Sequence, residues 1–207
     1  MTATKVDFKV AHKELYRASR DPALVDVPEL AFLMVDGHGD PYTATEYTQA
    51  IEALYTVSYS LKFAIKRARD GFDYGVMPLE GLWWVADMSK FTSSKKSDWD
   101  WTAMIMQPDR VTQDLLEDAL ASATAKKSLP AAAKLRLERF CEGPAAQVMH
   151  IGPYDAEGPT IKRLHEFIAE SGRTRRGKHH EIYLGDPRRS APEKLRTIIR
   201  QPVDAAR

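Results

Sequence analysis

The chain has 207 residues, enough for one large domain or two small ones with a proper buried core. Its 30 lysine and arginine residues balance its 29 aspartate and glutamate residues, and the net charge of +1 gives no reason to expect nucleic acid or an anionic membrane as a partner. The single cysteine, Cys141, excludes an internal disulfide and suits a reducing cytoplasm. Neither a signal peptide nor a run of about 20 apolar residues is present, so we expect a cytoplasmic protein.

The first half of the chain predicts a strand, a long helix and further strands. Residues 1–29 are polar and contain two prolines, so we interpret them as a lead-in segment. The apolar run 30–35 enters a glycine turn at 36–41. From Tyr47 to Ala68, apolar residues recur at three- and four-residue spacing, which is typical of an amphipathic helix. The other elements expected here are strands at 74–77, 82–86 and 101–106, a turn at 78–81, a polar loop at 90–98 and a helix at 111–123.

The second half predicts the same order of elements. Pro159 suits the first turn of a helix, whose buried side would carry Ile161, Leu164 and Ile168. Around this helix we expect strands at 135–137 and 146–151 separated by a turn at 142–144, a basic loop at 173–180, and strands at 181–184 and 195–200. The predicted class is α+β, with one domain over residues 30–207 made of half-repeats 30–127 and 134–203.

Two sequence echoes support the repeat. Met34 and Gly37 in FLMVDGHGDPY align with Met149 and Gly152 in the second half at a constant spacing. In the same way TAMIMQP (102–108) aligns with RTIIRQP (196–202). Two such units placed side by side would leave a cleft between them, and this cleft is the expected place for function.

Three motifs make the chain similar to a known family. MPLEGLWW (77–84), HIGPYDAEGPTIKRLHEF (150–167) and EIYLGD (181–186) resemble the GyrI-like small-molecule-binding superfamily over residues 25–203. The resemblance implies two SHS2-type β-α-β-β units related by a pseudo-twofold axis, with a ligand cleft between the sheets. The superfamily includes ligand domains of multidrug-sensing regulators, a DNA gyrase inhibitor, and a stand-alone branch that hydrolyses cyclopropane-bearing DNA-alkylating natural products. Residues 1–29 are too short for a helix-turn-helix module, so the stand-alone branch fits best.

Glu181 is the first candidate for catalysis. It opens a predicted strand and shares a face with Tyr183, while Ile182 and Leu184 are expected to face the helices. A carboxylate that faces aromatic rings is a plausible base with a shifted pKa, and the resemblance places a glutamate at this position in the ligand cleft. The alternative is an edge-strand carboxylate paired with an arginine such as Arg176 or Arg188.

Tyr154 is the second catalytic candidate. It follows Gly152 and Pro153 in a turn at the mouth of the expected cleft. Its phenol could donate a hydrogen bond to a ligand oxygen or to Glu181, and the alternative is a ring packed on Pro153.

Aromatic residues and two polar turn residues are the candidates for substrate binding. Trp83 and Trp84 point to opposite faces of a strand, so only one of them can line the cleft, and periodicity does not say which. Trp101 and Tyr183 could present further flat surfaces, or could belong to the core. Glu80 is either a second acidic group in the cleft or a carboxylate that stabilises the turn at 78–81, and His38 either reaches the cleft or is exposed.

No cofactor or metal is expected, because the histidines and the cysteine show no HExxH or CxxC spacing. The absence of a Gly-x-Ser-x-Gly motif disfavours a serine hydrolase.

The resemblance therefore implies a cofactor-free hydrolase that opens the activated cyclopropane of a toxic planar natural product and protects the cell. Glu181 would activate water, Tyr154 would position it, and a tryptophan with Tyr183 would stack on the ligand. The alternative is a protein that binds or sequesters lipophilic cations, with Glu181 as counter-charge. A third hypothesis, interaction with DNA gyrase, finds no support in the balanced charge.

Overall fold

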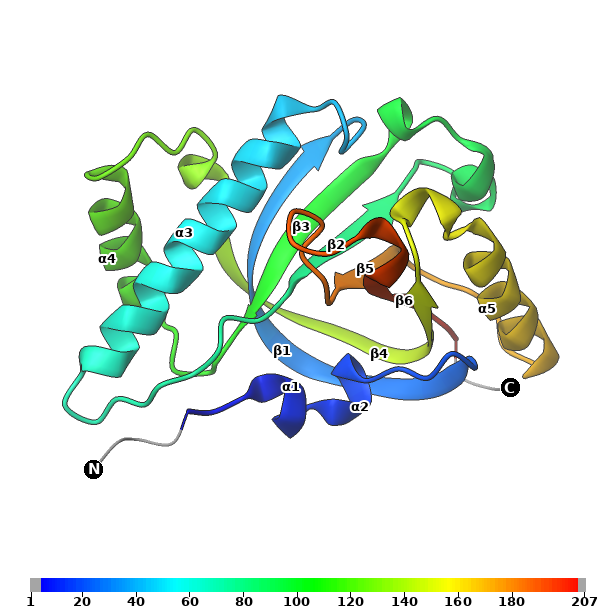
Figure 1. The fold of residues 1–207 in the computed structure, drawn as a ribbon, viewed down its shortest axis with the longest axis horizontal. Coiled ribbons are helices and arrows are strands. Elements are labelled where there is room, and N and C mark those ends of the chain that lie inside the picture. The colour runs from blue at the N-terminus through cyan, green and yellow to red at the C-terminus, as the bar shows by residue number, and fades with distance from the viewer. Residues whose placement is uncertain (1–4, 205–207) are drawn as a thin grey trace.

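The computed structural model describes residues 5–204, and its strands close into a barrel with the helices packed outside it (Figure 1). The strand order around the barrel is β1-β3-β2-β5-β6-β4, and every neighbouring pair is antiparallel. Closure of this kind leaves no free sheet edge. The strands are β1 (Ala23–His38), β2 (Leu79–Trp84), β3 (Asp100–Gln107), β4 (Arg136–Ile151), β5 (His179–Tyr183) and β6 (Arg196–Pro202).

The long strand β1 begins inside the predicted lead-in segment 1–29. Ala23 already pairs with Gln147 of β4, so the predicted boundary at residue 30 is wrong. Pro28 has no backbone N–H to donate, and β1 tolerates it because at this position only β4 lies beside the strand. The pairing of β1 with β3 begins at Ala31. The short helices α1 (Phe8–Ala11) and α2 (Lys13–Tyr16) also lie within this segment.

Two predicted turns are parts of strands. Residues 78–81 were expected to turn, yet Leu79–Gly81 belong to β2 and pair with β3. Residues 142–144 lie within the 16-residue strand β4, where Gly143 has a φ of +69° and kinks the strand without ending it. The expected strand at 74–77 is reduced to a single bridge between Tyr74 and Val6.

The helices follow the predicted periodicity closely. Helix α3 (Thr45–Arg67) packs on β1 and β3 and buries Leu54, Val57 and Leu61. Helix α4 (Gln113–Thr124) packs on α3, and α5 (Gly158–Glu170) packs on β4. The remaining helical segments are short 3-10 helices: η1 (Met88–Ser93), η2 (Lys96–Asp98), η3 (Ala132–Lys134), η4 (Tyr154–Ala156) and η5 (Pro192–Lys194). No helix within residues 5–204 is both long enough and apolar enough to cross a membrane.

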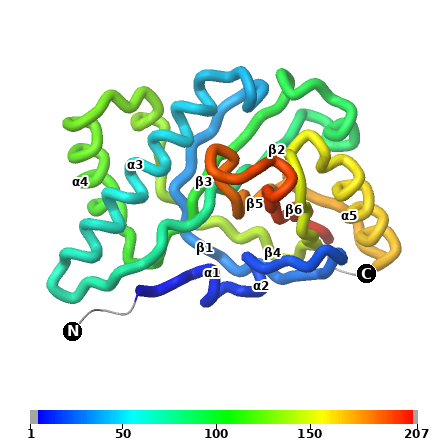
Figure 2. Tube along the Cα trace, in the orientation of Figure 1, coloured from blue at the N-terminus to red at the C-terminus, as the bar shows by residue number. Residues whose placement is uncertain are grey.

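The fold is mixed α and β, and the order strand, helix, strand, strand occurs twice along the chain, as β1-α3-β2-β3 and as β4-α5-β5-β6. The pseudo-twofold axis between the halves stays a prediction. In Figure 2 the segment between β5 and β6 crosses the front of the barrel, between α3 and α5 in this view.

The barrel strands have two distinct faces. Ile199 of β6 packs with Leu164 and Ile168 of α5, so its cross-strand partner Glu181 lies on the outer, helix-covered face. Ile182 therefore points to the inside of the barrel, and the prediction that it would face the helices is wrong. This alternation decides which side chains of β2, β5 and β6 meet Glu181.

Candidate functional site

Glu181 is the centre of a buried cluster on the helix-covered face of the barrel. The residue is only 8% exposed. The Tyr183 hydroxyl donates to Oε2 over 2.7 Å, and His179 Nε2 lies 3.1 Å from Oε1. A carboxylate offers only acceptors, so His179 carries its proton on Nε2. His179, Glu181 and Tyr183 alternate along β5 and thus share one face. The strand itself holds both carboxylate oxygens in place.

Trp83 extends this chain of hydrogen bonds from the neighbouring strand. Its Nε1 donates to the Tyr183 hydroxyl oxygen over 3.2 Å. In the β2–β5 register Gly81 lies opposite Glu181, and a Cβ at Gly81 would come within 2.7 Å of the Trp83 Nε1. The absence of a side chain at Gly81 therefore makes room for the indole beside Glu181. Trp83, and not Trp84, is the tryptophan of this pair that meets the candidate site.

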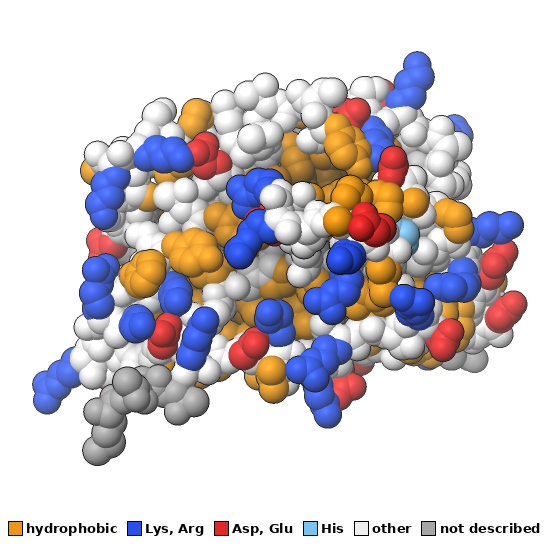
Figure 3. Space-filling view, viewed as in Figure 1, with side chains coloured by type: hydrophobic (Ala, Val, Ile, Leu, Met, Phe, Trp, Pro, Cys, Tyr) orange, Lys and Arg blue, Asp and Glu red, His pale blue; other side chains and the backbone are white. Residues whose placement is uncertain are grey.

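Aromatic rings from several elements surround the Glu181 cluster. Tyr47 of α3 lies with its ring centroid 5.5 Å from that of Trp83 and 5.0 Å from that of Trp101. Phe91 of η1 lies 5.2 Å from the His179 ring, and Tyr154 lies edge-on to Tyr183 at 5.4 Å. In Figure 3, hydrophobic side chains gather in the middle of the viewed face, between α3 and α5, where the surface is recessed. We call the rings and Glu181 together the aromatic site.

The rim of the aromatic site carries a cation. Lys96 of η2 lies with its Nζ 4.4 Å from the centroid of Tyr42, and 5.6 Å from that of Trp99. Trp99 in turn stacks on Phe91 with centroids 4.6 Å apart.

A second carboxyl group faces Glu181. Glu157, at the start of α5, is only 4% exposed. Burial and then the negative charge of Glu181 raise the pKa of Glu157 to about 9. Burial also acts to raise the pKa of Glu181, but the hydrogen bonds and charge of His179 and the hydrogen bond of Tyr183 outweigh it, so this pKa lies below its ordinary value. At neutral pH the pair thus consists of one carboxylate and one carboxylic acid.

The phenols of the aromatic site stay protonated. Burial, followed by the charges of Glu157 and Glu181, raises the pKa of Tyr154 to about 12 and that of Tyr42 to about 12. The phenols are therefore hydrogen-bond donors at any pH at which the protein works.

Three residues that the sequence proposed lie away from Glu181. Glu80 is on the inner face of the barrel, where it accepts a hydrogen bond from Tyr16 over 2.7 Å and lies 3.0 Å from His180. It adjoins Gly81 in a strand, and not in a turn, so alternation directs it away from the aromatic site. Trp84 is half-buried beneath Lys178, whose Nζ is 3.3 Å from the ring centroid, and His38 is exposed and pairs with Asp100 at 2.9 Å.

The arginines offered as alternative partners of Glu181 are engaged elsewhere. Arg176 donates to the backbone carbonyls of Glu142 and Val203, and Arg188 pairs with Asp186. Trp101 and Tyr154, in contrast, lie within the ring of aromatic contacts around Tyr47 and Tyr183.

Sequence reasoning missed several residues of the aromatic site. His179 precedes Glu181 by two positions, so period-two alternation could have placed it on the same face, but it was assigned to a basic loop. Phe91 lies in a segment interpreted as a polar loop, and Tyr47 was interpreted only as a helix core residue. Glu157 gave no signal, because a glutamate at a helix start is usually exposed.

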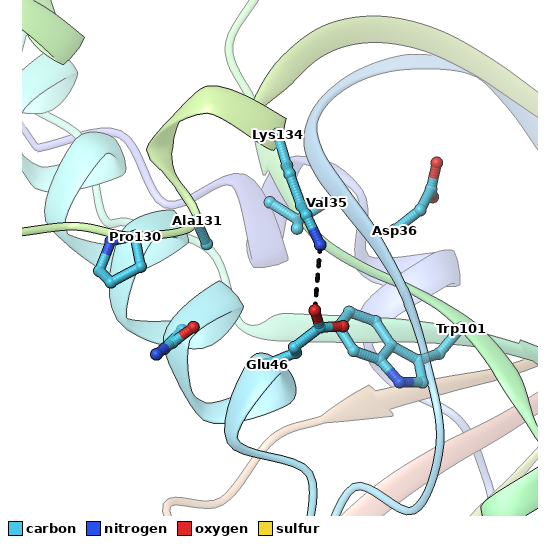
Figure 4. Close-up of a pocket in the computed structure, with 8 residues that line it drawn as sticks. Val35, Asp36, Glu46, Trp101, Pro130, Ala131 and Lys134 are labelled. Carbon is cyan, nitrogen blue, oxygen red and sulfur yellow. Dashed lines mark hydrogen bonds and ion pairs between the residues drawn. The ribbon is translucent and has the colours of Figure 1, made fainter.

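A separate small pocket lies on another side of Trp101. Its volume is about 130 Å³, and Figure 4 shows Glu46 and Lys134 pointing toward one another across it. Glu46 and Lys134 form an ion pair of 3.4 Å, so these two charges of the pocket neutralise each other. Within the described part of the chain, no group of three or more His, Cys, Asp or Glu residues is arranged to hold a metal ion.

A buried carboxylate among aromatic rings, on the helix-covered face of a barrel, is the kind of site in which proteins bind small molecules. The GyrI-like small molecule binding domain family matches residues 20–204, and the chain belongs to this family. No curated protein matches the chain.

Solved structures support the family membership. An uncharacterised conserved protein from Listeria innocua is 41% identical, with a TM-score of 0.90 over 97% of this chain and 100% of that chain. A protein from the same organism described as a hydrolase is 40% identical, with a TM-score of 0.85 and the same coverage of 97% and 100%. The EcmrR C-terminal domain is 14% identical, with a TM-score of 0.58 over 90% of this chain and 98% of that chain, and it shares the fold alone.

Proposed function

We propose that the protein is a cofactor-free hydrolase that opens the activated cyclopropane ring of planar, DNA-alkylating natural products and thereby protects the cell. The observation that carries this proposal is Glu181, an ionised carboxylate buried among aromatic rings and held by His179 and Tyr183. The description of a 40% identical Listeria innocua protein as a hydrolase agrees with the reaction class.

The chemistry needs one base and a dry, flat site. In such substrates the cyclopropane is conjugated to a dienone. Water attacks the unsubstituted ring carbon, a C–O bond forms, and the adjacent C–C bond breaks. Its electron pair moves through the dienone, which becomes a phenol. Glu181 takes the proton of the attacking water, and this proton is later released to the phenolate oxygen by way of solvent.

The remaining residues bind and orient the substrate in this proposal. Trp83, Tyr47 and Phe91 offer aromatic faces to a planar ligand and exclude bulk water. Tyr154 remains a donor because its pKa is raised to about 12, so it can hold the water or a ligand oxygen beside Glu181. Tyr183 fixes the orientation of the carboxylate through its 2.7 Å hydrogen bond.

Replacing Glu181 by glutamine tests the role of the base. Glu181→Gln removes the negative charge but keeps the shape, so we expect the turnover of a cyclopropadienone substrate to fall at least about 100-fold. The loss of dienone absorbance measures turnover, and quenching of tryptophan fluorescence measures binding, which should persist. Glu170→Gln, at an exposed position of α5, is the matched control. Turnover at the wild-type rate in Glu181→Gln would exclude Glu181 as the base.

The second candidate function is non-catalytic binding or sequestration of lipophilic cations. The same buried carboxylate among aromatic rings favours it, because cations bind to ring faces and to a counter-charge. In that case hydrophobic cations should quench the tryptophan fluorescence, the quenching should weaken in Glu181→Gln, and the dienone should not be consumed.

A further inference from the structure

Four buried polar atoms in or next to the aromatic site have no hydrogen-bond partner within residues 5–204. They are Glu157 Oε1, Thr197 Oγ1, His179 Nδ1 and Trp101 Nε1. Thr197 of β6 pairs in register with Tyr183, so it lies on the same face as Glu181. Buried polar atoms are almost always satisfied by protein or by ordered water. Glu157 and Thr197 both lie next to Glu181, so one polar group bound there would satisfy the free atoms of both side chains, and the smallest such group is water.

The side chain of Glu157 does not stabilise the start of its own helix. Glu157 is the N-cap residue of α5, yet its side chain makes no capping hydrogen bond. Its side chain is buried instead, facing Glu181 and Thr197. Neither helix capping nor contact with solvent therefore explains why this carboxyl group is present. Burying a carboxyl group costs free energy unless the group makes hydrogen bonds.

We propose that Glu157 is a second catalytic residue, an uncharged carboxyl group whose free Oε1 accepts a hydrogen bond from the attacking water and holds that water against Glu181. This inference rests on the proposed hydrolase function. The water then has one O–H directed to Glu157 and the other to Glu181, and its oxygen faces the substrate. When the C–O bond forms and the C–C bond breaks, Glu181 takes one proton of the water, while Glu157 keeps its own proton throughout.

The groups around Glu157 account for its uncharged state. Glu181 of β5 faces it with a negative charge, and the Tyr42 and Tyr154 phenols near it are neutral. Thr197 of β6 and Lys96 of η2 favour the ionised form, but burial and Glu181 outweigh them, so the pKa of Glu157 remains at about 9. Above that pH, ionisation would place a second negative charge in the site. This charge would repel Glu181 and oppose the negative charge that ring opening builds on the substrate.

The first part of the test compares pH profiles of the wild type, Glu157→Gln and Glu157→Ala with a cyclopropadienone substrate. Glutamine retains the carbonyl oxygen and stays uncharged, so Glu157→Gln should be clearly more active at pH 7 than Glu157→Ala. Wild-type activity should fall as the pH rises through about 9, and that of Glu157→Gln should not. Glu157→Ala should lose about 10-fold to 100-fold at pH 7 because the water is no longer held.

Two kinetic results would overturn the proposal. One is a loss in Glu157→Gln at pH 7 as large as that in Glu181→Gln, since the ionised carboxylate would then be required. The other is wild-type activity in a folded Glu157→Ala.

The second part is an infrared titration without substrate. The wild type should show the band of a protonated carboxylic acid at pH 7, which disappears as the pH rises through about 9 and is missing in Glu157→Gln. Turnover without this band would overturn the role of Glu157 and leave the hydrolase standing. The band without turnover would overturn the hydrolase, and the catalytic role with it, but not the uncharged state of Glu157. The band serves equally if Glu157→Ala fails to fold.

Discussion

Two glutamates of one site take different charge states because their surroundings differ. Glu181 receives hydrogen bonds from Tyr183 and His179, which favour its ionised form, whereas Glu157 is buried with an oxygen that no group satisfies. Pairs of carboxyl groups whose pKa values are pushed apart in this way commonly divide the work of an active site. At the residue scale, the hydrogen-bond partners decide the chemistry more than the residue type does.

Tyr183→Phe tests how far one hydroxyl sets the charge of Glu181. The hydroxyl donates to the ionised carboxylate, so its removal should raise the pKa of Glu181. The acidic limb of the kcat/KM profile should therefore move to higher pH, and the loss of Trp83's acceptor should weaken the fold by about 1–3 kcal/mol. Tyr59→Phe, at a half-exposed position of α3, is the control. An unmoved acidic limb would contradict the role of this hydrogen bond.

Alternation along a strand allowed some of these residues to be predicted. It placed Tyr183 with Glu181 and separated Trp83 from Trp84, as the structure has them. It could not decide which tryptophan meets Glu181, because that depends on the β2–β5 register. Glu157 was out of reach for a related reason, since its burial depends on where α5 begins relative to the barrel.

At the scale of elements, the β2–β5 pair places the aromatic site. Gly81 opposite Glu181 leaves space that the Trp83 indole fills, and the same indole donates to Tyr183. Because Gly81 has no side chain, the Trp83 ring of β2 can lie beside the Glu181 carboxylate of β5. Gly in a strand interior is otherwise unfavourable, which suggests a packing reason for this one.

Gly81→Ala should displace the Trp83 indole. The new Cβ would lie 2.7 Å from Nε1, so the ring must shift and its hydrogen bond to Tyr183 must weaken. We expect stability to drop by about 1–3 kcal/mol and kcat/KM to drop about 10-fold or more. Gly75→Ala is the matched control, because its Cβ would meet nothing closer than 3.8 Å. Equal effects of the two substitutions on kcat/KM would contradict this account of Gly81.

Elements with sustained periodicity were predicted well, and elements interrupted by glycine or proline were not. The long apolar stripe from Tyr47 onward predicted α3 almost to its ends. Gly143 and Pro144 predicted a turn, but pairing with β1 continues through both residues and keeps them within β4. Long-range strand pairing overrode the local preference for a turn. Such pairing cannot be predicted from a local sequence pattern.

At the scale of the whole molecule, a polar network inside the barrel joins both halves to the N-terminal segment. His180 lies 3.0 Å from both Glu80 and Glu142, and Arg200 reaches Glu142 at 3.2 Å. Arg200 also donates to the Leu15 carbonyl over 2.7 Å. The class of fold and the order of its elements could be predicted from the apolar patterns and turn signals along the chain. The closure of the barrel could not, because the β1–β4 pairing and the contact of Arg200 with Leu15 join residues more than a hundred positions apart.

The barrel network predicts how stability depends on pH. Burial acts to lower the pKa of His180, but Glu142 and Glu80 outweigh it and raise the pKa to about 9. A raised histidine pKa stabilises the fold fully below the unfolded value of about 6.5, and this stabilisation is lost as the pH rises through about 9. For Glu142 burial is likewise outweighed, and its pKa falls to about 2, so its contribution is present above about 4.5 and lost as the pH falls through about 2.

Glu157→Gln is the variant in which this dependence is best measured. Glu157 has a raised pKa, so ionisation of the unfolded chain makes folding progressively less favourable between about pH 4.5 and about pH 9, by an amount of the order of 1–3 kcal/mol at neutral pH. Glu157→Gln should remove that cost and should therefore be more stable than the wild type at pH 7. In this variant, urea denaturation should show that the free energy of unfolding falls between pH 6.5 and pH 9. This fall measures the stabilisation that protonated His180 contributes. A flat profile across that interval would mean that the barrel encloses an uncharged His180, and Arg200 would then be the cation that balances Glu142.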